Sequence, residues 1–372
     1  MSRKNEDKLL VLGQDLENVC LQAKDAGVLA LDTEFVWRNT YLPRLGIIQL
    51  GIDHENCFAL DCIPALATAS LKAAIEDASI VKILHDARQD LNLVHVYCGA
   101  VPQTIFDTQV AAVFAGLPSH YGLQKLLADV LDVHLPKTET CTDWLHRPLD
   151  PAQWIYALDD VRYLPALREE LLTRAESRGM RAWLEEEMVL HCTKIAEDIG
   201  LPETNWKRIR PRRGVTFDRR NYAILRELCA VREKWAKEWN FPRSWLGEDG
   251  FLANCAENGV VDHFHPRCPA AYMSRMKRFY EDAIAAALAL PEDEWPTDPH
   301  PYYIEEVKLA YAKALKWLEE KAASLQMDPS FIVNHATLIA FIDDAGDSEN
   351  PLNQGWRYEV FGAEIAEKFA VD

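Results

Sequence analysis

Long apolar runs, an apolar leader and paired cysteines are all missing from this sequence. No stretch of about 18 apolar residues occurs, so the sequence offers no membrane-spanning helix. The charged N-terminus, MSRKNEDKLL, lacks the apolar core of a signal peptide. The nine cysteines are scattered, and the nearest pair, Cys57 and Cys62, does not have zinc-ribbon spacing. We therefore expect a reduced, cytoplasmic protein without a disulfide scaffold or a zinc site.

Positive charge is scarce as well, since the formal net charge is −18. Nucleic-acid partners require Lys and Arg for their phosphates, so this balance at first argues against them. The distribution qualifies that argument: residues 206–293 carry 16 basic and 12 acidic residues, whereas residues 1–205 carry 18 and 31. The basic segment opens on a run of cations that includes Arg212 and Arg213. By itself, such a run fits a solvated linker as well as it fits phosphate contacts.

The chain is long enough for two or three domains, and its 49% hydrophobic content is ample for their cores. Strand-like runs at residues 28–31, 45–52 and 57–60 follow a predicted helix over residues 1–27. A fourth such run, at residues 80–84, comes after a short helix. Strands followed by alternating helices predict an α/β layer, in which the first three strands form a meander. Helices and loops are predicted for the rest of the chain.

The first predicted strand ends in two acids, Asp32 and Glu34. Side chains alternate along a strand, so these two project to the same side. Two carboxylates on one face repel each other and lose hydration unless a cation lies between them. The pair therefore predicts half of a metal-binding cluster.

Two later positions could complete the cluster. Asp90 follows the fourth strand at a predicted helix N-terminus, where the helix dipole alone favours an acid. Tyr156 and Asp160 are four residues apart on a helix that starts with a capping box at Asp150, and therefore share a face. Such a pair also occurs by chance. Taken singly, none of these signals is specific.

The order of these positions resembles the three motifs of the DEDD superfamily of 3′→5′ exonucleases, DxE, then Asp, then YxxxD. The surrounding sequence is similar to the ribonuclease D family in several segments: ALDTEFVWRNTYLPRLGIIQL, KILHDARQDLNLV, FDTQVAA, KTETCTDWLHRPL and YALDDVRYLPAL. The similarity continues to GWRYEV near the C-terminus, so it covers essentially the whole chain.

The resemblance implies an RNase H-like α/β exonuclease domain, a mixed sheet flanked by helices, over residues 1–205. An HRDC domain over residues 206–293 and a second HRDC-like helical domain over residues 294–372 follow. The YxxxD register selects Asp160 as the motif acid and leaves Asp159 as a solvated neighbour. Tyr at the first position of that motif places the chain in the tyrosine type of the superfamily.

The resemblance also implies a 3′→5′ exoribonuclease that releases nucleoside 5′-monophosphates. Four carboxylates would serve as hard oxygen ligands for two Mg²⁺ or Mn²⁺ ions: Asp32, Glu34, Asp90 and Asp160. Such ions can activate a water and stabilise both the phosphorus and the departing oxygen. Tyr156 would orient the water, because its ordinary pKa of about 10 makes it a poor base. The implied partner is RNA, tRNA precursors included, in a bacterial cytoplasm, and we expect a monomer.

Five residues are weaker candidates for substrate contacts. Phe35 could stack on the terminal base, and core packing is an equal alternative. His85 matches the second motif, although a histidine ending a buried strand is as often structural. Lys137 could hold the scissile phosphate. Arg212 and Arg213 belong to the basic module, the better candidate for gripping RNA.

Two nearby acids have simpler explanations. Asp107 is predicted to cap a helix, although the family match leaves a site role open. Asp143 lies in a segment that matches the family near the site, and it could equally cap a helix.

Two alternatives to an exoribonuclease stay open. A DNA exonuclease would use the same metal site, because the choice of RNA depends on a 2′-hydroxyl contact that the sequence does not reveal. A non-catalytic RNA-binding scaffold would retain the fold without turnover.

Overall fold

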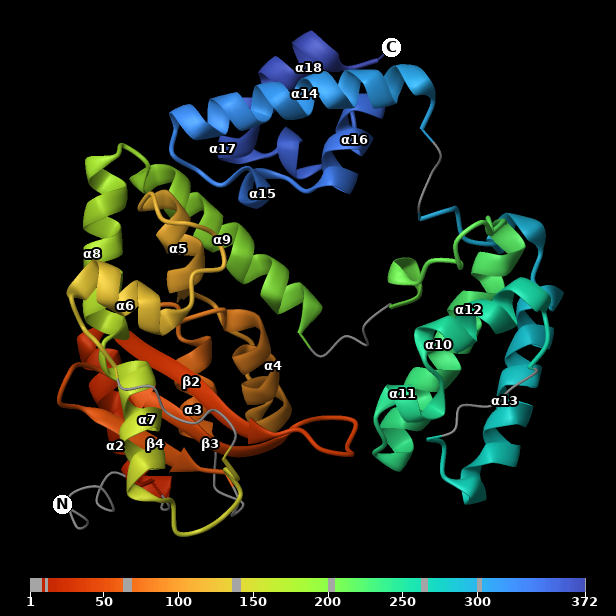
Figure 1. The fold of residues 1–372 in the computed structure, drawn as a ribbon. Coiled ribbons are helices and arrows are strands. Elements are labelled where there is room, and N and C mark those ends of the chain that lie inside the picture. Colours follow the sequence, from red (N-terminus) through yellow and green to blue (C-terminus); the bar gives the residue numbers. More distant parts are fainter. Residues whose placement is uncertain are drawn as a thin grey trace. The chain divides into compact units, whose positions relative to one another are not determined.

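The chain divides into two compact units in the computed structural model (Figure 1). The first unit comprises Met1–Val36, Leu45–Gly200 and Tyr303–Asp372, and the second comprises Trp37–Arg44 and Leu201–Tyr302. The structure describes residues 9–10, 13–62, 69–135, 142–199, 205–261, 267–299 and 303–371. The C-terminal segment thus belongs to the same unit as the α/β part. The bounds of the three domains expected from the sequence stay a prediction.

A six-stranded mixed sheet forms the centre of the first unit, in the order β1-β4-β3-β2-β5-β6. Its strands are β1 (Leu9–Leu10), β2 (Val28–Val36), β3 (Arg44–Gly51), β4 (Cys57–Asp61), β5 (Val81–Leu84) and β6 (Ile105–Asp107). β3 is antiparallel to β4, whereas β5 is parallel to both β2 and β6. The predicted α/β class, with a meander and a later strand, is confirmed.

Two parts of the strand prediction are wrong. The N-terminal segment is not one helix, because Leu9–Leu10 pairs with β4 as a parallel strand and α2 covers only Gly13–Ala26. β6 lies where only helices and loops were predicted. Both missed strands have two or three residues, too few to show a period of two, and they are fixed by pairing with strands distant in sequence.

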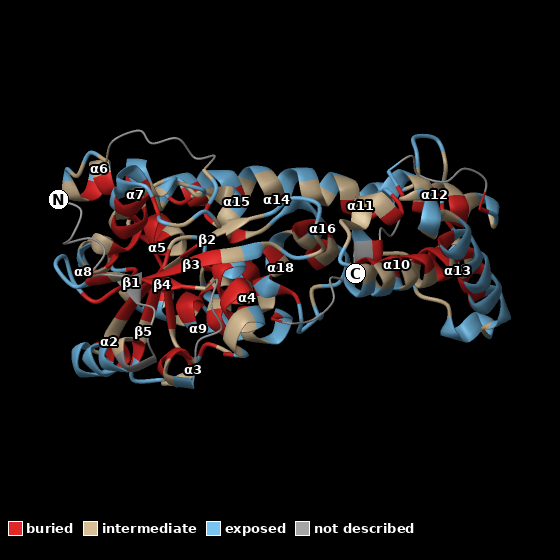
Figure 2. Ribbon diagram, turned by 90° about the horizontal axis from the view of Figure 1, so that it is seen from below, coloured by how far each residue is buried: buried red, intermediate tan, exposed pale blue. Residues whose placement is uncertain are grey.

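Helices cover both faces of the sheet (Figures 1 and 2). One face is covered by α2, α3 (Ala69–Glu76), α4 (Ala87–Cys98) and the C-terminal half of α9 (Arg181–Asp198). The other is covered by α5 (Thr108–Phe114), α7 (Pro151–Arg162) and α8 (Leu164–Ser177), with α6 (Leu123–Leu131) beside α8. The side chains of β2 alternate between the two faces. Leu29 and Leu31 pack into the core beneath α2, α3 and α4, and Ala30 packs into the core beneath α5, α7 and α8.

The C-terminal helices of the first unit pack on α5 and α9. They are α14 (Glu305–Ser324), α15 (Pro329–Ile332), α16 (His335–Asp343), α17 (Gly355–Arg357) and α18 (Ala363–Phe369). Trp356 is fully buried, its ring lies 5.9 Å from that of Trp183, and its indole N–H donates to Glu187 of α9 at 2.8 Å. Arg357 forms a two-pronged ion pair with the same carboxylate. These helices therefore share a core with the α/β part.

The second unit is helical, as predicted for this part of the chain. It contains α10 (Arg219–Trp239), α11 (Arg243–Leu246), α12 (Asp249–Asn258) and α13 (Ala270–Ala289). α10 starts with a reciprocal capping box between Asp218 and Asn221, with N···O distances of 3.0 and 2.8 Å. Across the residues described in both units, no helix has the length and apolar composition that a membrane crossing requires.

Candidate metal centre

β2 presents Asp32 and Glu34 to α7. Side chains two residues apart on a strand lie on the same face of the sheet. Ala30 lies in the core beneath α7, so Asp32 and Glu34 lie on that face as well. α7 adds Asp160. The carboxylate oxygens of Asp32, Glu34 and Asp160 all lie within 4.8 Å of one another. The structure therefore joins the first and third predicted motifs in one acidic cluster.

α7 is fixed at its start and along its length. The Asp150 backbone N–H donates to the Gln153 side chain at 2.9 Å, which completes the predicted capping box. On β3, a Cβ at Gly51 would lie only 2.9 Å from the Val161 carbonyl oxygen, so glycine permits the close approach of α7 to the sheet. The close packing of α7 on the sheet thus fixes the position of Asp160 relative to Asp32.

Asp90 is not among the three acids within 4.8 Å of one another, and it is linked to their strand from the opposite layer. Thr33 alternates with Asp32 and therefore points toward α4, where its hydroxyl donates a hydrogen bond to the Asp90 carboxylate. Asp107 holds the first turn of α4, because it accepts from the backbone N–H groups of Asp86 (3.1 Å) and Ala87 (2.9 Å). It also accepts from Gln109 at the start of α5, so the predicted capping role is confirmed.

Burial and mutual repulsion raise the pKa values of the four acids. Burial first, and then the charge of Asp160, raises the pKa of Asp32 to about 8. Burial and the neighbouring acids raise the pKa of Glu34 to about 9, and burial with the charge of Asp159 raises that of Asp160 to about 7. The pKa of Asp90 also lies well above its ordinary value, through burial and then Asp32. Such a cluster is stable in its charged form only with a cation, and carboxylate oxygens suit Mg²⁺ or Mn²⁺.

Tyr156 lies beside the cluster as a hydrogen-bond donor. Burial, and then the charge of Asp160, raises the pKa of its hydroxyl above the ordinary value. The hydroxyl stays protonated at neutral pH, and its hydrogen bond to Asp160 lowers the pKa of that carboxyl. Its ring lies 6.1 Å from that of Trp144, which is buried. These properties fit a group that orients a water and do not fit a base.

Thr33 and Gln49 contact the cluster, although sequence reasoning did not single them out. Gln49 is fully buried in β3, and its amide nitrogen lies 3.4 Å from an Asp32 oxygen. Its amide oxygen has no hydrogen-bond partner among the described residues. The available signal was a polar residue at the centre of the apolar run GIIQLG. A buried polar side chain in such a run requires a partner, and here the partner is a motif acid.

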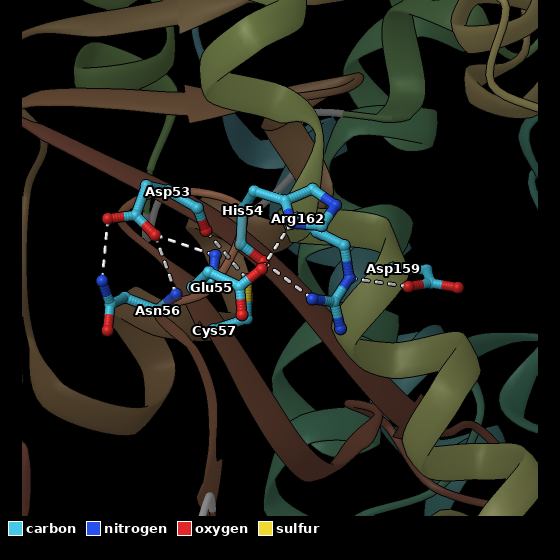
Figure 3. Close-up of polar contacts among 7 residues, drawn as sticks. All are labelled: Asp53, His54, Glu55, Asn56, Cys57, Asp159 and Arg162. Atoms are coloured by element: carbon cyan, nitrogen blue, oxygen red, sulfur yellow. Dashed lines mark hydrogen bonds and ion pairs between the residues drawn. The ribbon is translucent and has the colours of Figure 1, made fainter.

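Asp159 is not a solvated neighbour, and that expectation is wrong. Its carboxylate forms an ion pair with Arg162 at 2.9 Å, and the side chain is only 17% exposed (Figure 3). Arg162 also donates to the His54 carbonyl oxygen at 2.7 Å, which ties α7 to the turn between β3 and β4 (Figure 3). The sequence register separates Asp159 from Asp160 correctly, but it does not reveal this tertiary partner.

The weaker candidates have different surroundings. Phe35 is half-buried, and it is not among the described residues of the two hydrophobic clusters of the first unit. His85 is half-buried, and its Nδ1 lies 2.9 Å from the Thr108 hydroxyl. The same hydroxyl lies 3.0 Å from the Leu84 carbonyl oxygen, so His85 and the end of β5 share Thr108 as a partner. Burial lowers the pKa of His85, which keeps the imidazole neutral.

Lys137 lies outside the described residues. Asp143 accepts from the Leu145 backbone N–H at 3.0 Å, a turn contact. In the second unit, Arg212 pairs with Glu257 at 2.7 Å but stays 68% exposed, and Arg213 is exposed.

The chain resembles known proteins along its whole length. A protein-family model described as 3'-5' exonuclease matches residues 13–176. Ribonuclease D of Desulfotalea psychrophila is 32% identical over 365 residues, covering 95% of this chain and 96% of the relative. Ribonuclease D of Granulibacter bethesdensis is 31% identical, covering 97% and 93%. The crystal structure of Escherichia coli RNase D, 24% identical, matches with a TM-score of 0.81 over 98% of this chain and 99% of that one, which shows a common fold.

Proposed function

Because this chain belongs to the ribonuclease D family of 3′–5′ exonucleases, we propose that it hydrolyses RNA from the 3′ end and releases nucleoside 5′-monophosphates. The observation that carries the proposal is the acidic cluster, in which three carboxylates lie within 4.8 Å and a fourth is bonded to the same strand through Thr33. No protein nucleophile is required, since water is the attacking group.

The cluster would hold two divalent ions through four residues: Asp32, Glu34, Asp90 and Asp160. When bound, such ions supply the Lewis acidity that activates a water and stabilises the leaving 3′-oxygen. The chain's own residues supply orientation. Tyr156 keeps its hydroxyl proton on Asp160 and offers its oxygen as an acceptor for the attacking water. Thr33 and Gln49 fix the directions of Asp90 and Asp32. Phe35 follows the two strand acids directly and would stack on the terminal base.

RNA 3′ ends, those of tRNA precursors among them, are the substrates that we propose. The relatives that match nearly the full chain are named for ribonuclease activity, which favours RNA over DNA. A monomer in the cytoplasm is the proposed working form.

Digestion of matched RNA and DNA strands tests this function. With Mg²⁺ and a 5′ label, the RNA should shorten by one nucleotide at a time and yield 5′-monophosphates, and the DNA of the same sequence should shorten much more slowly. Preferential shortening of the DNA would replace the proposal by a DNA exonuclease. Absence of any shortening would favour a scaffold.

The basic entry of the second unit is proposed to contact phosphates. Exchanging Arg212 and Arg213 for glutamine should weaken RNA binding and reduce the salt slope by about 1 to 2, since each phosphate contact adds nearly one to that slope. Arg212 stays accessible beside Glu257. Binding is measured between low and high salt, and an unchanged slope would remove these residues from the interface.

A further inference from the structure

The second unit carries a line of aromatic rings where α10 meets α13. The line, here called the aromatic seam, consists of Trp235, Trp239, Tyr272 and Phe279. Trp235 stacks on Phe279 with centroids 4.3 Å apart, and Trp239 lies 4.8 Å from Trp235 and 4.5 Å from Tyr272. All four side chains are half-buried, so each keeps part of its surface in solvent.

The aromatic seam lies along the edge of the core of the second unit, and all four of its rings pack against that core. Ala236 on α10 and Met276 and Tyr280 on α13 are buried in its core. The seam residues stand beside these positions, at i and i+4 on one helix and at i and i+7 on the other, and so form a stripe along the helix boundary.

Two cations face the rings of the seam. The Arg275 guanidinium lies 5.3 Å from the Trp239 ring centre and 6.0 Å from that of Trp235, and the Lys234 ammonium lies 5.2 Å from that of Trp235. Both side chains are exposed, and within the described part of the chain neither has a carboxylate within 4.0 Å. Two exposed cations therefore lie over the stacked rings of the seam.

A second group of cations over a tryptophan, in the first unit, differs from the aromatic seam in its ion pairs. Trp317 of the first unit is also half-buried, with Lys321 at 4.8 Å and Lys368 at 5.1 Å from its ring centre. There, however, Glu364 pairs with both lysines. The charge at Trp317 is neutralised within the protein, whereas the charge at the seam is available to a ligand.

We propose that the aromatic seam is a stacking platform for unpaired bases of RNA, with Arg275 and Lys234 contacting the phosphates between them. Flat rings accept any base face, and adjacent cations follow the backbone, which is the combination that single-stranded nucleic acids require. This inference rests on the proposed function, because it extends RNA contact from the carboxylate cluster to a separate unit. It predicts binding that favours unpaired over fully paired RNA.

The platform is tested by measuring the equilibrium binding of RNA to the full chain. All variants also carry Asp160→Asn, so that the RNA is not hydrolysed during the measurement. Trp235→Leu with Trp239→Leu should weaken binding of an unpaired 12-nucleotide RNA by about tenfold or more, the expectation for losing base–aromatic stacking. A blunt RNA duplex should lose much less. The salt slope should stay the same, because no phosphate contact is removed.

Two further variants protect the test against misfolding. Trp235→Phe with Trp239→Phe keeps the rings and should retain most of the affinity, while Trp317→Leu, the matched tryptophan with neutralised cations, should leave it unchanged. Folded leucine variants that bind unpaired RNA as tightly as their parent would overturn the proposal. Equal losses for unpaired and paired RNA would also overturn it. Binding needs no turnover, so failure of the wild type to hydrolyse RNA would refute the proposed function and leave this measurement intact.

Discussion

Exchange of Asp160 for asparagine is expected to slow RNA hydrolysis by about a thousandfold or more, whereas the same exchange at Asp159 should leave most of the activity. Metal ligation contributes several kcal/mol to such reactions, and each 1.36 kcal/mol corresponds to about tenfold in rate. Asp160 lies within 4.8 Å of two other acids, while Asp159 is paired with Arg162. The two variants carry the same Asp→Asn exchange at adjacent positions and therefore have the same net charge. A difference in their rates reports the role of the Asp160 carboxylate itself.

Single-turnover rates on labelled RNA with Mg²⁺ give the comparison. If Asp159→Asn proved as inactive as Asp160→Asn, the YxxxD register chosen here would be wrong. If both variants retained full activity, the hydrolysis would come from another site.

Stability of the metal-free proteins provides the control for folding. The pKa of Asp160 is raised from 3.8 to about 7 in the folded chain. From about pH 4 to pH 7 the unfolded chain releases a proton that the folded chain retains, so this site destabilises the fold as the pH rises through that window. Metal-free Asp160→Asn should therefore unfold at a higher temperature than the wild type at pH 7, by about 2–4 °C for each kcal/mol of repulsion removed. The difference should vanish near pH 4, where both states hold the proton.

The acidic positions could be predicted because each depends on local structure. Asp32 and Glu34 follow from the alternation of one strand, and Tyr156 with Asp160 follows from the period of one capped helix. Their meeting could not be derived from either element, and the motif order of a known family supplied it. What the sequence did not reveal depends on contacts between elements, as in the pairing of Thr33 with Asp90 across two layers.

The same limit applies to the architecture. The meander and the later strand were predicted from apolar runs, whereas β1 and β6 are defined only by their pairing with distant strands. The association of Tyr303–Asp372 with the α/β part was not visible either, because it depends on contacts between distant segments, among them the buried Glu187 carboxylate. Glu187 stands in a run of three glutamates, where sequence alone predicts a solvated helix face.

Glu187 connects the C-terminal helices to the acidic cluster through α9. Trp356 and Arg357 bind its carboxylate. One turn further along α9, the His191 imidazole lies 3.2 Å from Asp107, the residue that holds the first turn of α4. Asp90 lies on that helix. Each link is a direct contact or a single helix, so loosening the anchor at Trp356 should affect the position of Asp90.

Trp356→Ala is therefore expected to destabilise the first unit by about 3–5 kcal/mol, the usual cost of removing a fully buried tryptophan. The protein should also lose activity at a temperature well below that of the wild type, because α9 and Asp107 lose their support. Hydrogen exchange of α9, measured by mass spectrometry in the full chain, reports the effect on the first unit alone. Trp356→Phe keeps the ring but removes the bond to Glu187, and should cost only about 1–3 kcal/mol. Unchanged exchange protection of α9 in Trp356→Ala would show that the C-terminal helices do not support the catalytic part of the chain.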